Sequence, residues 1–277
     1  MMPLDPQGCR DDLARLIDPL MELVLEAGDL VMEVYARDFA IAAKEDESPV
    51  TEADQRAEAL ITPVLHSLLP GVPVVAEEAA AAGQVPASSE LGQRFWLVDP
   101  LDGTREFIQR NGEFTVNVAL IEDGRPVLGV VLAPALGQLY AGVAGLGAFT
   151  QAGGDAGTRQ AIECRLPPAE GLTVLTSRSH GDLAALDAYL AGRRVAQVRN
   201  AGSSLKLCLL AAGEADLYPR FGRTMEWDIA AGQAVLEASG GQVEDLQGRP
   251  LRYGKPGFEN PDFVALGRHA DHAAGAS

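Results

Sequence analysis

Phe95-Trp96-Leu97-Val98-Asp99-Pro100-Leu101-Asp102-Gly103-Thr104 is the most informative segment of the sequence. The apolar residues before Asp99 are typical of a short buried strand. Ionised carboxylates at the end of such a strand are costly, and neighbouring ones repel each other unless cations compensate them. Because Mg²⁺ prefers oxygen ligands and keeps water molecules that can attack a substrate, the segment predicts a divalent-metal site at the mouth of the strand.

The backbone after this strand also favours a phosphate site. Pro100 has a fixed φ that holds a turn, so we expect Asp99, Asp102 and the carbonyl of Leu101 to converge on one spot. Gly103 permits an unusual backbone angle, and a short helix from Thr104 would direct free N–H groups to the same place. Metal ions beside an anion hole suit a phosphoryl group. The alternative is that the Asp-Pro and Asp-Gly pairs only form turns.

Three acids elsewhere in the sequence are candidates for the same site. Glu77 directly follows a strand-like run, and Asp228 opens a predicted helix. Asp54 is the third residue after Thr51, so a capping box, which stabilises a helix by ~1 kcal/mol, is a serious alternative for it. Asp228 has a similar alternative, since an acid at a helix N-terminus is favourable by ~0.3–1 kcal/mol.

Composition limits the partners of the chain. The 277 residues include 22 Lys and Arg against 39 Asp and Glu, a formal net charge of −17, which disfavours nucleic acid. Apolar residues make up 47% of the chain, enough for a packed core. The three cysteines, Cys9, Cys164 and Cys208, are too widely spaced for a disulfide framework or a CxxC metal site. No run reaches the ~18 apolar residues of a membrane span, and the chain start is unlike a signal peptide. We expect a cytoplasmic protein without an integral membrane segment, with peripheral association at the inner membrane as an open alternative.

The hydrophobic pattern predicts a mixed α and β protein. The first half is expected to form two long helices, two short strands and a hairpin, with a flexible loop at 79–90. The second half alternates strand and helix. The expected elements are helices at 11–35, 51–69, 182–190, 203–212 and 227–238, and strands at 72–76, 95–98, 114–121, 127–132, 139–141, 147–150, 172–176, 195–198 and 215–218. We place a boundary near 155–168, which predicts an N-terminal α+β domain over 8–160 and a C-terminal α/β domain over 161–270.

Two separated segments, Trp96–Thr104 and Trp227–Gly232, resemble the paired signature of the lithium-sensitive, Mg²⁺-dependent inositol monophosphatase superfamily. The resemblance spans roughly residues 11 to 266. Further segments most resemble the bacterial 3'(2'),5'-bisphosphate nucleotidases, which hydrolyse adenosine 3',5'-bisphosphate, a by-product of sulfate assimilation, to AMP and phosphate. These segments are Asp102–Asn117, Ser177–His180, Gly202–Lys206 and Ala215–Gly222. The resemblance implies an α/β class fold, the layered α-β-α-β-α sugar-phosphatase fold, with catalysis at the junction of the two parts.

The resemblance also implies a set of metal ligands. The first Mg²⁺ would be held by Glu77, Asp99 and the Leu101 carbonyl, and the second by Asp99, Asp102 and Asp228. A third, weaker ion would lie near Glu77 and Asp54.

The catalytic and substrate-binding residues follow from the same resemblance. Asp54 and Thr104, with Glu77, would act on the attacking water, while the amides of Gly103 and Thr104 would bind the scissile phosphate. Asp228 would also contact the substrate. A pocket for the nonscissile 5'-phosphate is expected from Ser177, His180, Ser203, Lys206 and Arg220. His180 taken alone is equally consistent with an ordinary surface residue.

These observations predict a Mg²⁺-dependent phosphatase that removes the 3'-phosphate of adenosine 3',5'-bisphosphate, as a monomer or a homodimer. One alternative is an enzyme of the same superfamily that acts on inositol monophosphate or another sugar phosphate. An alternative of another class is a nucleotide-binding sensor without turnover. The number of acids argues against the sensor, because a pure binder has little need for carboxylates beside an anionic ligand. Inhibition by Li⁺ is a further expectation from the resemblance.

Overall fold

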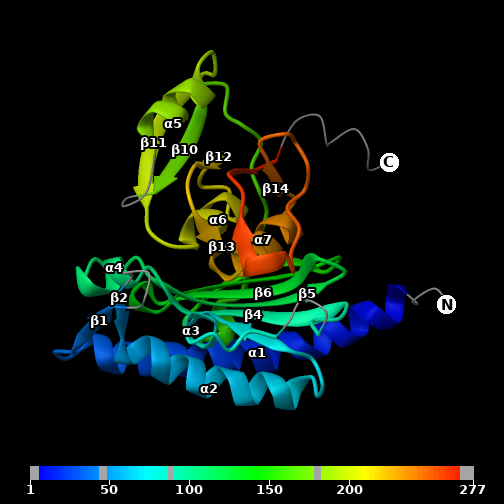
Figure 1. Cartoon of the computed structure of the whole chain (residues 1–277). Helices are drawn as coiled ribbons and strands as arrows, with labels where there is room; N and C mark the ends of the chain where they lie inside the picture. Colours follow the sequence, from blue (N-terminus) through cyan, green and yellow to red (C-terminus); the bar gives the residue numbers. More distant parts are fainter. Residues whose placement is uncertain (1–5, 44–48, 87–89, 178–181, 269–277) are drawn as a thin grey trace.

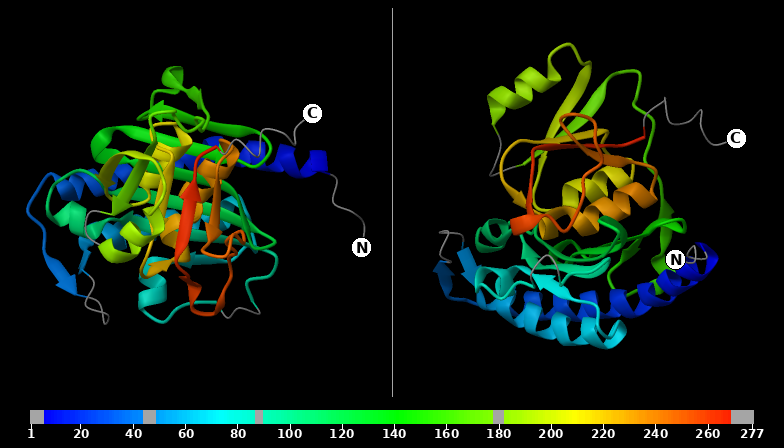
Figure 2. Two further views of the ribbon diagram at one scale, coloured as in Figure 1. Left: turned by 90° about the horizontal axis from the view of Figure 1, so that it is seen from above. Right: turned by 45° about the vertical axis from the view of Figure 1, so that its right-hand side comes forward.

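A computed structural model describes residues 6–43, 49–86, 90–177 and 182–268. Five layers are stacked in the order α-β-α-β-α, as the sequence predicted (Figure 1). The outer helices α1 (Pro6–Tyr35) and α2 (Glu52–Leu68) lie along one face of a seven-stranded sheet (Figure 2). Their apolar residues recur at steps of three and four, so that one face of each helix is buried against the sheet.

The seven-stranded sheet carries the predicted hairpin and the two acid-ended strands. β3 (Val74–Ala76) pairs in parallel with β4 (Arg94–Asp102), and the remaining neighbours pair antiparallel. The strands lie in sequence order, with β5 (Thr115–Glu122), β6 (Arg125–Ala133), β7 (Gln138–Val143), β8 (Gly147–Ala152) and β9 (Gln160–Ile162) following β4. The parallel pair therefore brings the end of β3 beside the end of β4.

The second sheet is mixed, with the strand order β11-β10-β12-β16-β14. It is covered on its outer side by α5 (Leu183–Leu190), which follows the N-cap residue Asp182 (Figure 1). The strands are β10 (Leu172–Ser177), β11 (Val195–Ala201), β12 (Leu217–Arg220), β14 (Gln242–Asp245) and β16 (Phe263–Leu266). The sequence predicted β10, β11 and β12 but neither β14 nor β16, which are only four residues long.

The central layer consists of α6 (Leu205–Ala211) and α7 (Glu226–Ala238) between the two sheets. α7 lies so close to the first sheet that two strand glycines are required. A Cβ atom on Gly129 would lie 2.4 Å from the Ala231 carbonyl oxygen, and one on Gly142 would lie 2.5 Å from the Cα of Val235. This close packing fixes the start of α7, and with it Asp228, relative to the first sheet.

Two local expectations are wrong. The chain does not leave the sheet after Val98, since β4 continues through Asp102 with a break in the pairing register with β5 between Asp99 and Asp102. A bulge of this kind redirects side chains without ending the strand. The segment 79–90 is not loop throughout, because α3 (Glu77–Ala81) occupies its start, where consecutive alanines favour a helix.

The predicted boundary between residues 160 and 161 falls inside β9. One continuous apolar core joins the two parts, since Phe95 and Val131 of the first sheet share a cluster with Leu207 and Phe263. The division into two domains stays a prediction. Small elements complete the fold, namely β1 (Ile41–Ala43), β2 (Pro49–Thr51), α4 (Thr104–Ile108), η1 (Pro134–Leu136), η2 (Ala156–Thr158), β13 (Thr224–Met225), η3 (Pro256–Phe258) and β15 (Glu259–Asn260).

Candidate active site

A cavity of about 780 Å³ lies where the end of β4 meets α3, α4 and the starts of α6 and α7. This volume suits a small-molecule ligand. Most of the residues that the sequence predicted for the site line this one cavity: Glu77, Asp99, Leu101, Asp102, Gly103, Thr104, Ser177, Ser203, Lys206, Arg220 and Asp228. Asp54 reaches the site through a contact with Thr104. His180 was also predicted, but it lies outside the described residues.

The bulge in β4 aims its two acids at the cavity. Asp99 is 1% exposed, and one of its oxygens accepts a hydrogen bond of 3.1 Å from the Leu101 N–H. Asp102 accepts a hydrogen bond of 2.5 Å from the N–H of Ser204, the N-cap residue of α6. Short backbone contacts of this kind fix the orientation of both carboxylates before any ligand binds.

The acids lie close enough to repel one another. Burial raises the pKa of Asp99 well above its ordinary value, and the charges of Glu77, Asp102 and Asp228 and a hydrogen bond with Glu77 raise it further. The pKa of Asp228 is likewise raised well above its usual range, by burial and then by Asp102 and Glu77. Burial raises the pKa of Asp102 to about 6, although the ammonium of Lys206 opposes the shift. Carboxylates from three chain segments therefore meet in one place.

This donor set fits Mg²⁺. Asp99, Asp102 and Asp228, whose pKa values are raised, lie beside a fourth carboxylate, Glu77, and together they need positive charge. Hard oxygen ligands of this kind are those that Mg²⁺ prefers. In the part of the chain that the structure describes, no three Asp, Glu, His or Cys side chains form a ready-made metal cage.

Asp54 forms the predicted cap and also reaches the wall of the cavity. Its Oδ2 accepts hydrogen bonds of 2.7 Å from both the N–H and the hydroxyl of Thr51, which is the predicted helix cap. Its Oδ1 faces the hydroxyl of Thr104 at 3.4 Å. Because one oxygen caps α2 and the other reaches the cavity wall, the cap positions the acid for the site.

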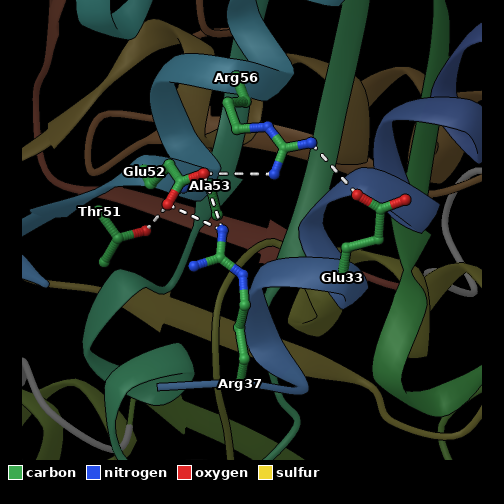
Figure 3. Close-up of polar contacts among 6 residues, drawn as sticks. All are labelled: Glu33, Arg37, Thr51, Glu52, Ala53 and Arg56. Atoms are coloured by element: carbon green, nitrogen blue, oxygen red, sulfur yellow. Dashed lines mark hydrogen bonds and ion pairs between the residues drawn. The ribbon is translucent and has the colours of Figure 1, made fainter. Parts of the chain in front are cut away.

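Exposed ion pairs hold the start of α2 in place (Figure 3). Arg37, just after α1, contacts Glu52 at 2.8 Å. Arg56 lies between Glu52 at 3.3 Å and Glu33 of α1 at 3.2 Å (Figure 3). The hydrogen bond with Arg37 lowers the pKa of Glu52, so this carboxylate is ionised at neutral pH. The contacts tie α2 to α1 next to the residue pair Thr51 and Asp54.

Gly103 joins β4 to α4 with a φ of 88°. Only glycine adopts this left-handed angle freely, and a Cβ here would lie 3.2 Å from the Glu113 carbonyl oxygen. The turn puts the first residues of α4 against the cavity directly after Asp102, as the sequence predicted.

Lys206 is buried, and its ammonium already has protein partners. It donates to the carbonyls of Ala201 at 3.1 Å and Ser203 at 2.6 Å, and it lies 5.2 Å from the centre of the Tyr218 ring. Burial lowers the pKa of Lys206 to about 8. These contacts support the segment before α6, where Ser203 has a φ of 42°. A contact of Lys206 with substrate phosphate stays a prediction.

Sequence reasoning missed a hydroxyl and amide network below the acids. The Ser204 hydroxyl contacts Asn117 Oδ1 at 2.7 Å and the Thr115 hydroxyl at 2.9 Å, both from β5. The one sequence signal for Ser204 is its position beside Ser203 in the segment Gly202–Lys206. The cavity is also lined by Arg105, Arg223, Trp227 and Phe258, which were not predicted as site residues.

The sequence matches the inositol monophosphatase family over residues 12–275. It is 46% identical over 251 residues to the 3'(2'),5'-bisphosphate nucleotidase CysQ of Escherichia coli strain K12, which covers 90% of this chain and 98% of that one. The Haemophilus influenzae protein of the same name is 30% identical, with 91% and 93% of the two chains covered. The crystal structure of CysQ from Bacteroides thetaiotaomicron superposes with a TM-score of 0.77 and 32% identity, covering 96% of this chain and 99% of that one. An IMPase of Thermotoga maritima has a TM-score of 0.75 and 26% identity, with 91% and 92% covered.

Proposed function

The chain belongs to the inositol monophosphatase family, and we propose that it is a metal-dependent 3'(2'),5'-bisphosphate nucleotidase that hydrolyses adenosine 3',5'-bisphosphate to AMP and phosphate. The observation that carries this proposal is the gathering of Glu77, Asp99, Asp102 and Asp228 at one cavity that is also lined by Lys206 and Arg220. The acids are suitable ligands for metal ions, and the two cations can balance the charge of a second phosphate. The nucleotidases that match nearly the whole chain support this choice.

The proposed metal is Mg²⁺, as two ions with a third, weaker one. Glu77, Asp99 and the Leu101 carbonyl would hold the first ion, and Asp99, Asp102 and Asp228 would hold the second. The third would be held near Glu77 and Asp54. When bound, Mg²⁺ neutralises phosphate oxygens and lowers the pKa of a bound water.

The protein's own residues orient the attacking water. The Thr104 hydroxyl lies 3.3 Å from the Leu101 carbonyl and 3.4 Å from Asp54 Oδ1. When its one hydrogen is donated to Asp54, a lone pair of the Thr104 oxygen is left to accept a hydrogen bond from water. As the water attacks, its proton would pass to the Thr104 oxygen while the Thr104 hydroxyl proton passes to Asp54, and Glu77 would assist as a ligand of the first ion. The N–H groups of Gly103 and Thr104 bind the scissile phosphate, and positioning of this kind is most of phosphoryl-transfer catalysis.

The nonscissile 5'-phosphate lies among Ser177, Ser203, Lys206 and Arg220, and Asp228 contacts the substrate from the start of α7. Arg220 is 7% exposed, and its Nη2 donates to the Arg223 carbonyl at 3.1 Å, which fixes the direction of the guanidinium. On a chain with a net charge of −17, a cluster of cations in a cavity is what attracts a doubly phosphorylated ligand.

The test compares phosphate release by the purified protein in Mg²⁺ from three substrates: adenosine 3',5'-bisphosphate, its 3'-phospho-5'-phosphosulfate parent and inositol monophosphate. We expect the bisphosphate to have the highest kcat/KM. Arg220→Met and Lys206→Met should each raise KM for the bisphosphate far more than for the monophosphate. Arg249→Met, which removes a guanidinium that is 73% exposed and outside the cavity, is the matched control.

The outcomes separate the alternatives. Equal losses on both substrates favour an enzyme for inositol monophosphate or another sugar phosphate. Absence of turnover on every phosphomonoester favours the nucleotide sensor.

Three finer proposals accompany this function. Li⁺ inhibits by occupying the second metal position, so a lithium-insensitive enzyme would contradict that ligand set. The protein is cytoplasmic, as a monomer or a homodimer, and size-exclusion chromatography and cell fractionation distinguish these states from peripheral attachment at the inner membrane. Among the described helices, none combines the length and apolarity that crossing a bilayer requires.

A further inference from the structure

A strained turn closes one side of the cavity. Residues 254–258, here called the pocket turn, lead into β15, and Gly257 and Phe258 line the cavity. Gly257 has a φ of 76° and Phe258 a φ of 56°. A bulky aromatic residue is disfavoured in this left-handed region and persists there only where its surroundings fix it. The turn therefore needs an anchor.

The anchor is a fully buried carboxylate. Glu226, the first residue of α7, is 0% exposed. Its two oxygens accept hydrogen bonds from the N–H groups of Gly254 at 2.8 Å and Lys255 at 2.9 Å, and the Lys255 ammonium lies 2.7 Å from Oε1. Burying a carboxylate is costly, and three donors, one of them charged, offset that cost.

Lys255 forms further hydrogen bonds with residues beyond the pocket turn. Its ammonium donates to the Arg252 carbonyl at 2.5 Å and to Asn260 Oδ1 at 3.2 Å. The Asn260 amide in turn donates to the Met225 carbonyl at 2.7 Å, and β13 pairs with β15 at this point. Both ends of the pocket turn are thus fastened to the residues that precede Asp228.

The anchored turn brings a small apolar surface, the edge of a buried cluster, to the wall of a cavity that is otherwise rich in charge; Phe258 and Trp227 are 5% and 6% exposed. The rings of Phe258 and Trp227 lie 6.0 Å apart, and both residues line the cavity with Met225 and Ile229. Neither phosphate nor ribose needs such a surface, since both are polar. A nucleobase does, because its faces are apolar and planar.

We propose that Glu226 and Lys255 are positioning residues that hold Phe258 against the base of the substrate, so that this contact distinguishes a nucleotide from a base-free sugar phosphate. This inference rests on the proposed nucleotidase function, whose substrate selection it explains. It assigns the base to the side of the cavity formed by the pocket turn and the start of α7.

The test is a calorimetric binding measurement in Mg²⁺ with two probes, AMP and ribose 5-phosphate, which differ only by the base. The wild-type protein should bind AMP at least tenfold more tightly. Phe258→Ala should weaken AMP binding at least about fivefold, the smaller end of what alanine substitution of a base-stacking aromatic residue costs, and should change ribose 5-phosphate binding less than twofold. Glu226→Gln and Lys255→Met should each reduce the preference for AMP in the same direction, and Lys255→Arg should retain it.

Controls separate positioning from general damage. Glu214→Gln is the same kind of exchange as Glu226→Gln but at an exposed residue outside the cavity lining, and it should leave both affinities unchanged. Phe258→Leu keeps apolar bulk if Phe258→Ala fails to fold. Loss of both affinities together in Lys255→Met, or an unchanged preference in folded Phe258→Ala and Phe258→Leu, would overturn the inference. So would a wild-type protein that binds the two probes equally or not at all.

Failure of the proposed nucleotidase function gives results that differ from failure of the base contact. A wild-type protein that prefers AMP over ribose 5-phosphate through Phe258, yet releases no phosphate from adenosine 3',5'-bisphosphate, would refute the nucleotidase function and leave the base contact standing. A protein with full turnover and no effect at Phe258 would refute only the base contact.

Discussion

Replacing Asp102 with asparagine should stabilise the metal-free protein at neutral pH while abolishing its activity. The pKa of Asp102 rises from an ordinary 3.8 to about 6, chiefly through burial. A rise of about 2 pKa units corresponds to about 3 kcal/mol of lost folding free energy once the carboxylate is ionised. The asparagine side chain would carry no charge and would keep an oxygen to accept the Ser204 N–H.

The sign of the pH dependence follows from linkage. A raised pKa means that the folded protein binds the Asp102 proton more tightly than the unfolded chain does. The stability that this group contributes is therefore fully present below pH ~4 and is lost as the pH rises through about 6. The advantage of the variant should grow across this interval and level off above it. The charge of Asp102 also raises the pKa values of Asp99 and Asp228. Removing that charge lessens the repulsion on these two carboxylates, which stabilises the variant further.

The expected gain in folding free energy is moderate. Asp102 is half-buried, so we halve the figure for solvent screening and expect about 1–2 kcal/mol. For a chain of this size, each kcal/mol shifts the melting temperature by about 2–4 °C. Asp102→Asn should then melt about 2–8 °C above the parent at pH 7.5 in EDTA and only about a third as far above it at pH 4.5.

The assay is thermal unfolding followed by circular dichroism at several pH values, in EDTA and in Mg²⁺, with kcat measured in parallel. Mg²⁺ should raise the melting temperature of the parent by more than that of Asp102→Asn, and kcat should fall about 10³-fold because one metal loses a ligand. Asp187→Asn, on the exposed side of α5, is the matched control and should be neutral. A variant that melts below the parent at pH 7.5 in EDTA, or whose shift does not change with pH, would refute the reasoning.

Three further predictions concern the site and its support. Thr104→Ala should lower kcat about 10²-fold with little change in KM because the water loses its orienting hydroxyl, whereas Thr104→Ser should retain most activity; a raised KM with normal kcat would contradict this role. Gly129→Ala should lower the melting temperature by an amount equivalent to about 1–3 kcal/mol, since its Cβ would overlap Ala231, and an unchanged melting curve would show that α7 packs less closely than described. Asp216→Asn should destabilise the protein to urea by about 3 kcal/mol because it leaves Arg165, which forms two 2.8 Å contacts with Asp216, without its counter-charge; a loss below about 1 kcal/mol would mean that solvent replaces the pair.

Much of the fold was predictable because its largest elements have strong local patterns. The apolar periodicity of residues 11–35 sufficed to predict α1, and the alternation around 114–132 predicted the hairpin of β5 and β6. β14 has a single apolar residue and so shows no strand pattern, whereas β16 is a continuous apolar run, which periodicity alone does not assign to a strand or a helix. The pairing of both is set by the strands beside them.

The acids of the site were predictable because each directly follows an apolar run or opens a helix. Their surroundings were not. The sequence left a helix cap and a catalytic role as alternatives for Asp54. In the structure one of its oxygens forms the cap and the other contacts Thr104, and its catalytic role stays a proposal. The burial of Lys206 and the contact between Glu226 and Lys255 depend on residues that are distant in the sequence and are brought together by packing. The spacing of residues in the sequence does not predict such contacts.

The most direct test of the metal-dependent nucleotidase is phosphorus NMR of the purified protein incubated with adenosine 3',5'-bisphosphate. With Mg²⁺ present, the two substrate resonances should be replaced by those of AMP and inorganic phosphate, and EDTA should stop the conversion. Formation of adenosine 3'-phosphate, or conversion that continues unchanged in EDTA, would contradict the site as described.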